Sequence, residues 1–386
     1  MNNYSDAYAD LILNHMLGLK EGEKLYINCT VETVEFAHKV AKLAAEIAHI
    51  SSFVVFIEKG KVEAVDEFEP NGKYMIKENG VAMLHLASFN CPSLEEDSEL
   101  TAPLLQQFSL LAEPIDTERR IGVPWANVYV PTQSWAQFLL GEEATIDQLW
   151  MQLAQVLSLD DDYKALYNTQ HKLLSTRCKK VQNYNFKTLE LENGNTKLTL
   201  PVITKAKVAS TASNLKNVRN YFPTLPCEDV VILVDKTKVE GRLYTTKPFK
   251  LFDKIINKAY FKIEKGKVVD YDLEEYNSLF KLYSEVDEAA SRVGQLILCD
   301  ELTLISQTDG LFGVPALDRM RSTTLSLGGV DINTINFSSM EEVEQLNINT
   351  AFVHLELPLG SQDLQIYGIL ENGERIQIVE DGLFLD

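Results

Sequence analysis

The sequence predicts an α/β protein built from two parts. Residues 1–180 are expected to form an N-terminal α/β domain with a mainly parallel sheet, and residues 181–386 a C-terminal, β-rich, mixed α+β domain. Three observations carry this prediction. The chain has 386 residues, enough for about two domains. Strand and helix patterns alternate near the N-terminus, and short strand patterns separated by turns dominate the second half.

The first elements form a strand–helix–strand run. Residues 24–29 (KLYINC) read as a short strand, and apolar residues recur at helical spacing through residues 32–50. Residues 53–57 (FVVFI) form an uninterrupted apolar run that is typical of a buried strand. Such a unit favours a parallel sheet covered by helices.

The remaining N-terminal elements follow the same alternation. We expect further strands and helices, in chain order a strand at 81–87, a helical region at 100–111, a strand at 126–130, and helices at 147–157 and 162–176.

The second half begins with a hairpin signal. Residues 187–191 and 197–200 flank the turn sequence Glu192-Asn193-Gly194-Asn195. Residues 340–346 predict a short helix, and residues 351–357 (AFVHLEL) alternate as a strand does.

Composition excludes several classes of partner. The chain has 36 Lys and Arg against 56 Asp and Glu, a net charge of −20. Nucleic acids and anionic membrane surfaces both need a basic footprint, so we expect neither as a partner. The 5 cysteines are odd in number, with no Cys-x-x-Cys pair. This favours a reducing cytoplasm over a disulfide framework.

Several catalytic motifs do not occur in the sequence. It contains no phosphate-binding G-x-x-x-x-G-K-[ST] loop and no G-x-G-x-x-G opening a helix after a strand. It also lacks a G-x-S-x-G elbow and an H-E-x-x-H pair. Nucleotide chemistry and serine hydrolysis therefore have no motif to support them.

One histidine stands out from the six. His354 and Glu356 lie two residues apart in the strand predicted at 351–357, so both side chains leave the same face. An imidazole and a carboxylate on one face can share a divalent metal or form a hydrogen-bonded pair. An isolated pair of this kind is also typical of a solvated strand face.

The residues after this pair resemble a known metal motif. The segment 354–368 (HLELPLGSQDLQIYG) is similar to the terminal motif of the thermophilic metallo-aminopeptidase family, peptidase family M29. There, H-x-D on a strand precedes a G-S-x-E-L-D-I-like turn and strand. Residues 8–25 resemble the family's opening segment, and residues 129–136 (YVPTQSWA) its P-T-x-x-W-A segment. The shared order extends the resemblance over nearly the whole chain.

The resemblance implies an activity and a mechanism. The family releases N-terminal amino acids from peptides, and its assembly is a homodimer. Two adjacent divalent metals activate a water and polarise the scissile carbonyl. First-shell ligands must be anionic or imidazole groups to lower the pKa of that water.

The family's ligand positions are only partly kept. In the P-x-G-E-V segment, here residues 226–230, Asp229 takes the carboxylate position, with Glu228 beside it as a fallback. Gln295 stands where an L-G-E motif supplies a carboxylate to both metals, and Thr324 stands at a histidine. A neutral amide is a poor metal ligand and supplies no bridging charge.

The last motif keeps two ligand types. His354 is retained, Glu356 replaces the aspartate, and Asp331 stands where the family has a tyrosine. We therefore predict no more than one Zn²⁺ or Co²⁺, held by Asp229, His354 and Glu356 with Asp331 as a further candidate. A site with no metal stays open as an alternative.

That alternative rests on two arginines. Arg319 and Arg321 lie close in sequence to the vacated histidine position, and either can pair with the carboxylates in place of an ion. The readings are then an M29-like aminopeptidase, an inactive homologue that binds peptides or proteins, or an unrelated one-metal hydrolase. The sequence assigns no catalytic residue beyond the metal positions.

Overall fold

The computed structural model describes most of the chain. The described residues are 4–47, 49–58, 61–68, 80–89, 123–160, 162–215, 219–308, 310–330 and 340–386. The chain divides into two compact units, the first formed by Met1–Asn90, Glu113–His171 and Thr211–Cys227 and the second by Cys91–Ala112, Lys172–Ser210 and Glu228–Asp386. The domain boundary near residue 180 stays a prediction. The helical region predicted at 100–111 lies outside the described residues.

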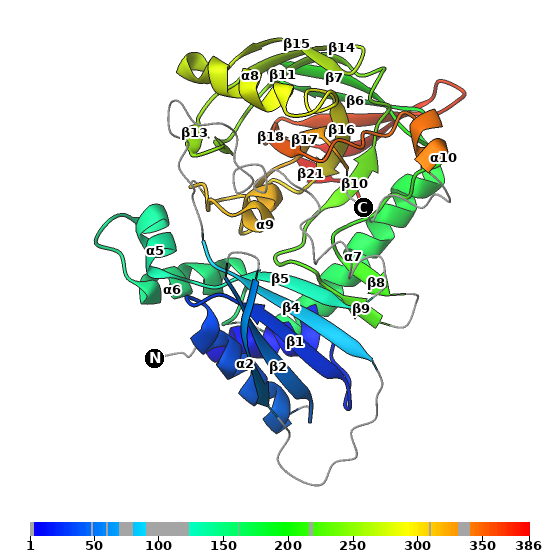
Figure 1. The fold of residues 1–386 in the computed structure, drawn as a ribbon. Helices are drawn as coiled ribbons and strands as arrows, with labels where there is room; N and C mark the ends of the chain where they lie inside the picture. Colours follow the sequence, from blue (N-terminus) through cyan, green and yellow to red (C-terminus); the bar gives the residue numbers. More distant parts are fainter. Residues whose placement is uncertain are drawn as a thin grey trace. The chain divides into compact units, whose positions relative to one another are not determined.

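The first unit contains a five-stranded sheet in the order β3-β2-β1-β4-β5 (Figure 1). Its strands are β1 (Lys24–Cys29), β2 (Ser51–Glu58), β3 (Lys61–Phe68), β4 (Val81–Ala87) and β5 (Trp125–Tyr129). β1 runs parallel to β2 and β4, and β4 runs parallel to β5. This confirms the predicted α/β class and mainly parallel sheet. The antiparallel edge strand β3 was not predicted, and it leaves Val62 and Val65 exposed.

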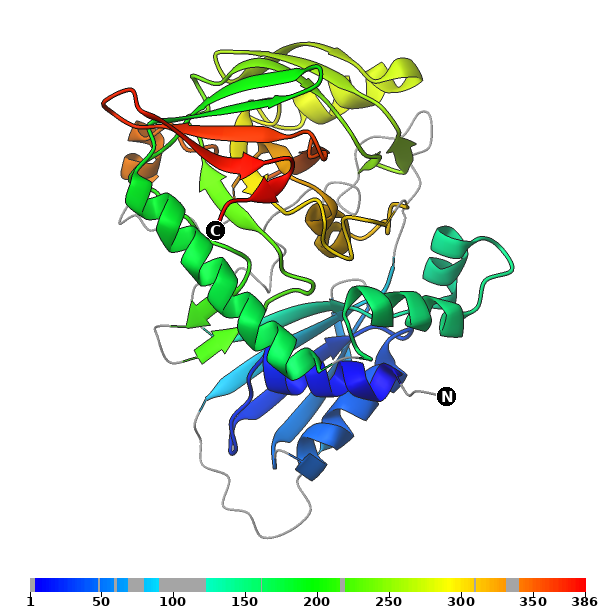
Figure 2. The same ribbon diagram turned by 180° about the vertical axis from the view of Figure 1, so that it is seen from behind.

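Helices surround this sheet. They are α1 (Tyr4–Leu11), which continues as a π-helical turn (Ile12–Met16), α2 (Val34–Ile47), α5 (Gln133–Leu140), α6 (Ile146–Val156) and the start of α7 (Tyr163–Tyr184). α2 packs on β1 and β2 through a face of small apolar residues. Ala37, Val40 and Ala44 are fully buried there. Thr145 is the N-cap of α6 and forms a capping box with Gln148. α7, the long green helix in Figure 2, extends beyond its predicted end.

A short hairpin belongs to the first unit although it lies late in the sequence. It consists of β8 (Ser213–Leu215) and β9 (Arg219–Tyr221). Arg219 forms a buried ion pair with Glu23, and its Nη1 donates to the Leu17 carbonyl at 3.4 Å. These contacts attach the segment to the turn before β1.

The second unit is rich in antiparallel strands. An eight-stranded sheet has the order β15-β14-β11-β7-β6-β19-β20-β21. Its strands are β6 (Thr188–Asn193), β7 (Thr196–Pro201), β11 (Glu240–Tyr244), β14 (Tyr260–Glu264), β15 (Lys267–Asp272), β19 (Gln365–Ile369), β20 (Arg375–Glu380) and β21 (Leu383–Phe384). β6 and β7 form the predicted hairpin. The β-rich, mixed character predicted for this part of the chain is confirmed.

A second, four-stranded sheet carries the predicted ligand positions. Its order is β10-β16-β17-β18, with β10 (Val230–Leu233), β16 (Val293–Leu298), β17 (Thr324–Gly328) and β18 (His354–Pro358). All three pairings are antiparallel. The remaining elements of the unit are β12 (Phe249–Leu251), β13 (Lys254–Ile256), α8 (Asn277–Glu285), α9 (Pro315–Asp318), α10 (Met340–Gln345) and the 3₁₀ turns Glu274–Tyr276 and Arg319–Arg321. Among the residues described, no helix is both long and apolar enough to cross a membrane.

Candidate functional site

The ladder of the four-stranded sheet brings four predicted positions onto one face. Gln295 pairs with Ser326, and Ser326 pairs with Glu356. Thr324 and His354 each lie two residues from a member of this row, so their side chains leave the same face. We call the face that carries Gln295, Thr324, His354 and Glu356 the donor face.

Asp229 extends the donor face at its other edge. Leu233 on β10 pairs with Gln295, and Asp229 lies four residues before Leu233, one residue before the strand begins. Strand alternation therefore directs Asp229 to the same side as Gln295. Its side chain is completely buried. A buried carboxylate needs a charged or hydrogen-bonding partner.

Arg319 provides that partner. Its Nη2 lies 3.0 Å from Asp229 Oδ2, and its Nη1 lies 3.5 Å from Glu356 Oε1. Only 12% of the Arg319 side chain is exposed. One guanidinium therefore contacts the two carboxylates that the sequence predicts as metal ligands. Charge-assisted contacts of this kind are among the stronger polar interactions in proteins.

His354 is fixed at both ring nitrogens. Nδ1 lies 3.1 Å from the Gly329 carbonyl, and Nε2 lies 2.9 Å from Glu356 Oε1. A carbonyl only accepts, so Nδ1 must carry the hydrogen and donate it. A histidine that ligates a metal through Nε2 makes the same Nδ1 contact. Here Nε2 is bonded to Glu356, which is the hydrogen-bonded alternative that the sequence left open.

Gly328 allows β18 to lie close enough for this contact. It pairs with His354 and has a φ of +89°, a backbone conformation that residues other than glycine rarely adopt. A Cβ at this position would lie 2.1 Å from the Val353 carbonyl oxygen. The glycine therefore fixes the approach of β18 to β17 beside His354.

The two replaced ligand positions supply neither an anion nor an imidazole. Gln295 is completely buried in β16. The Thr324 hydroxyl donates to the Ser322 carbonyl at 3.0 Å, so it serves the local backbone. Both side chains occupy the donor face, and neither brings the charge that a metal centre needs.

The other residues proposed from the sequence have different contacts or lie outside the described residues. Glu228 is half-buried, and its backbone N–H donates to Met320 Sδ at 3.4 Å. Asp331 lies outside the described residues. Arg321 is buried, and its Nη1 donates to the Pro248 carbonyl at 3.2 Å. Arg319, and not Arg321, therefore contacts the carboxylates of the donor face.

Arg321 lies in a second charged environment. Its Nη1 is 3.8 Å from Asp318 Oδ1, and its Nε and Nη2 have no hydrogen-bond partner within the described part of the chain. Burial lowers the pKa of Arg321. Burial also raises the pKa of Asp318 to about 7, while Arg321 opposes that rise.

Two thiols near Asp229 were not predicted from the sequence. Burial raises the pKa of Cys178 to about 12, with a further contribution from the Asp229 charge. The same two causes, burial first, raise the pKa of Cys299 well above its ordinary value. Both therefore stay neutral thiols and do not supply the thiolate that binds metals. No local motif links α7 and the end of β16 to Asp229, so only the fold reveals their proximity.

A half-buried lysine and a buried glutamate hold the turn that carries Arg319. Lys247 Nζ donates to Glu301 Oε2 at 3.0 Å, to the Ser306 carbonyl at 2.8 Å and to the Arg321 carbonyl. Glu301 Oε1 accepts from the Thr323 N–H at 3.0 Å. No sequence motif predicts this pair. Its bonds to the Arg321 carbonyl and the Thr323 N–H hold the end of the turn that carries Arg319.

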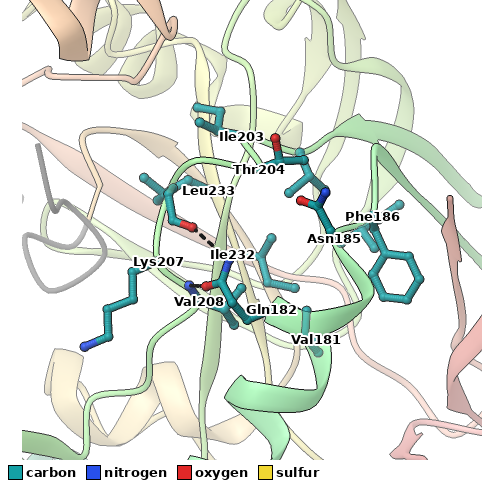
Figure 3. Close-up of a pocket in the computed structure, with 13 residues that line it drawn as sticks. Val181, Gln182, Asn185, Phe186, Ile203, Thr204, Lys207, Val208, Ile232 and Leu233 are labelled. Carbon is teal, nitrogen blue, oxygen red and sulfur yellow. Dashed lines mark hydrogen bonds between the residues drawn. The ribbon is translucent and has the colours of Figure 1, made fainter. Parts of the chain in front are cut away.

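No donor-face residue lines the pocket in Figure 3. It is lined by the end of α7, the segment after β7 and part of β10, and includes Gln182, Lys207 and Ile232. Gln182 uses its amide on the pocket wall, donating to the Ala206 carbonyl at 3.3 Å and accepting from the Val208 N–H at 2.7 Å. None of the predicted metal ligands lines this pocket.

Comparison with known proteins relates this chain to a family. The profile of the family described as thermophilic metalloprotease (M29) matches residues 2–384. Aminopeptidase 2 of Geobacillus stearothermophilus is 25% identical over 402 residues, covering 98% of this chain and 96% of that protein. Aminopeptidase T of Thermus aquaticus is 22% identical, covering 97% and 96%. Wild-type AmpT from Thermus thermophilus has the same fold, with a TM-score of 0.78 at 17% identity and 99% coverage of both chains.

A metalloprotease family implies a divalent metal, and the donor face does not fit one as it stands. Within the described ranges, no three His, Cys, Asp or Glu side chains are grouped closely enough to hold an ion. The Arg319 guanidinium lies against Asp229 and Glu356, where its charge would repel a dication. Gln295 and Thr324, which stand where the sequence resemblance expects two ligands, carry an amide and a hydroxyl. The arrangement is that of an ion-pair network.

Proposed function

Because the chain belongs to the M29 family of thermophilic metalloproteases, we propose that it has kept the family fold and lost the metal-dependent hydrolysis of peptides. It would act as a peptide-binding or interaction protein. The observation that carries this proposal is the identity of two donor-face residues, Gln295 and Thr324. They replace the carboxylate and the histidine that the family motifs have at these positions.

The chemistry of the reaction explains why these two replacements matter. Peptide hydrolysis at neutral pH needs a water of lowered pKa, and two metals provide it through anionic and imidazole ligands. An amide and a hydroxyl do not take over that role. Loss of the bridging carboxylate should reduce metal affinity by more than the roughly tenfold to hundredfold typical of a change outside the ligand shell.

A cationic group of a peptide is the ligand that the remaining charges favour. Asp229 and Glu356 each present a carboxylate on the donor face, and Arg319 contacts both. The chain as a whole has a net charge of −20. A peptide's terminal ammonium would be attracted by this field.

The first test is hydrolysis of amino-acid p-nitroanilides with added Co²⁺ or Zn²⁺. We expect no turnover above a chelator-treated control. Metal-dependent turnover that Glu356→Ala abolishes would overturn the proposal and establish an active aminopeptidase.

The second test is calorimetric binding of short peptides with a free amino terminus and of the same peptides N-acetylated. We expect the free amine to bind more tightly. If neither form binds, the peptide-binding part of the proposal fails and the search moves to protein partners.

A one-metal hydrolase is the second candidate. It is favoured by the shared face of Asp229, His354 and Glu356 and by the Nδ1 contact of His354 with the Gly329 carbonyl, which suits a metal ligand. This candidate predicts hydrolysis that depends on one ion and is lost in His354→Ala.

We also propose, from the family resemblance and the cysteine usage, that the protein is a cytoplasmic homodimer. Light scattering at several protein concentrations tests the dimer. A constant monomer mass would contradict it.

A further inference from the structure

We infer that Arg319 is the resident cation of the donor face. Its guanidinium takes the charge-neutralising role that the family resemblance gives to a divalent ion, and it keeps such an ion out while it is in place. This inference rests on the proposed function, because it explains how the donor carboxylates are stabilised in a member without the two-metal reaction.

The first support is geometric. The two carboxylates come from opposite edges of the four-stranded sheet, since Asp229 precedes β10 and Glu356 lies on β18. Arg319 contacts Asp229 through Nη2 at 3.0 Å and Glu356 through Nη1 at 3.5 Å. The two nitrogens of one guanidinium therefore connect the two edge strands across the donor face, a task to which a planar, forked cation is suited.

The second support is burial. Asp229 is completely buried, and the Arg319 and Glu356 side chains are only 12% and 20% exposed. Two carboxylates this poorly solvated would repel one another without a nearby positive charge. In the described part of the chain, the guanidinium is the positive charge that contacts both of them.

The third support is the anchoring of Arg319 itself. The Cys299 thiol donates to the Arg319 carbonyl at 3.8 Å. Two residues along the chain, the Lys247 ammonium donates to the Arg321 carbonyl, and Glu301 accepts from the Thr323 N–H. The turn is thus fixed on both sides, and the guanidinium is held by the fold and not by chance contact at the surface.

A consequence follows for metal binding. Removing the guanidinium leaves Asp229, Glu356 and the His354 Nε2 on one face without the cation that contacts both carboxylates. These are oxygen and nitrogen ligands of the kind that Zn²⁺ and Co²⁺ accept. The donor face should therefore take up a divalent ion once Arg319 is neutralised.

The test is Co²⁺ binding to wild type and to Arg319→Met, measured by equilibrium dialysis with metal analysis and by the visible absorption of bound Co²⁺. We expect wild type to retain none. We expect the variant to retain about one equivalent, the content of a single three-ligand site, and its thermal unfolding midpoint to rise when Co²⁺ is added.

Three further variants make the result specific. Arg321→Met removes the neighbouring buried arginine, which contacts Pro248 and Asp318, and should gain no Co²⁺. Arg319→Lys keeps the positive charge and should also gain none. The double variant Arg319→Met/His354→Ala should lose the Co²⁺ binding that Arg319→Met gains. It should also lose the absorption band of the bound Co²⁺.

Two results would overturn the inference. One is a folded Arg319→Met protein, verified by circular dichroism, that retains no more Co²⁺ than wild type. The other is stoichiometric Co²⁺ retention by wild type or by Arg319→Lys, which can be measured even if Arg319→Met fails to fold. Neither result depends on peptide hydrolysis. Turnover by wild type would overturn the proposed function, whereas an inert wild type with a metal-free Arg319→Met would overturn this inference alone.

Discussion

The two units each bury an arginine against carboxylates, but they use it differently. In the first unit, Arg219 pairs with Glu23 alone, and both side chains are less than a tenth exposed. In the second unit, Arg319 contacts both Asp229 and Glu356, and His354 extends the network. The first pair is balanced one to one and joins two chain segments. The second is shared among two carboxylates and an imidazole, at the position where the family resemblance expects an ion.

The difference lies in what each arginine neutralises. A balanced buried pair stabilises a fold through geometry, and apolar residues of similar volume can often replace it. A guanidinium between two carboxylates neutralises negative charge that the surrounding sheet brings together. The comparison therefore predicts that removing each arginine lowers the free energy of unfolding by a different amount.

The largest effect is expected at Arg319. Replacing it with Met leaves Asp229 fully buried and Glu356 largely buried without their shared cation. Breaking a buried pair by removing one partner costs about 3–5 kcal/mol, and two stranded carboxylates place this variant at the upper end. Urea unfolding near neutral pH measures the loss. A loss below about 1 kcal/mol, the range of exposed pairs, would contradict the shared-cation account.

Arg219→Met should cost less than Arg319→Met. It strands one carboxylate, Glu23, which still accepts the Lys20 N–H at 2.8 Å. We expect a loss near the lower end of the range of about 3–5 kcal/mol and no recovery on adding Co²⁺. Paired unfolding curves with and without Co²⁺ provide the measurement. Recovery with metal in this variant would remove the contrast between the two arginines.

Asp318 should make stability depend on pH. Burial raises its pKa to about 7 in the folded protein, against an ordinary value of about 4 in the unfolded chain. Between these values the folded state keeps a proton that the unfolded state has lost, so this contribution to stability falls as pH rises from about 4 to 7. Asp318→Asn stays neutral and keeps the Oδ1 that accepts the Phe312 N–H.

We therefore expect Asp318→Asn to be more stable than wild type near pH 8, by up to about 4 kcal/mol, since the two pKa values differ by about three units and each unit is worth about 1.4 kcal/mol. The variant should also lack this part of the pH slope. Unfolding free energies measured across the range test both points. Parallel pH profiles for the two proteins would refute the assignment to Asp318.

The smallest effect is expected at an exposed pair. Arg375 Nε lies 3.2 Å from Glu190 Oε2, and both side chains are 46% exposed. Arg375→Ala should cost about 0.2–1 kcal/mol, the usual range of solvated ion pairs. Thermal unfolding at low and high salt checks this value. A cost comparable with that of Arg219→Met would mean that burial is not what separates these arginines.

Local sequence patterns predicted much of the fold. The strand at residues 24–29 was found as expected, and the hairpin around Gly194 follows from its turn residues. These elements are encoded by periodicity and turn chemistry within short windows. The edge strand β3 was missed, and the end of α7 was placed too early, because tertiary packing decides such features.

The candidate site was predictable only in part. The spacing of His354 and Glu356 already implied a shared face. The row that joins Gln295, Ser326 and Glu356 depends on a register between distant strands, which no local pattern gives. Arg319 and Arg321 were equal candidates in sequence, and the contacts of the turn separate them.

The most direct test of the central claim is the metal content of the wild-type protein after equilibration with Zn²⁺ or Co²⁺ and removal of free ion. If Arg319 is the resident cation, the protein should retain no stoichiometric metal. Retention of about two equivalents per chain, as in a two-metal hydrolytic centre, would contradict the account and return the chain to the active aminopeptidases.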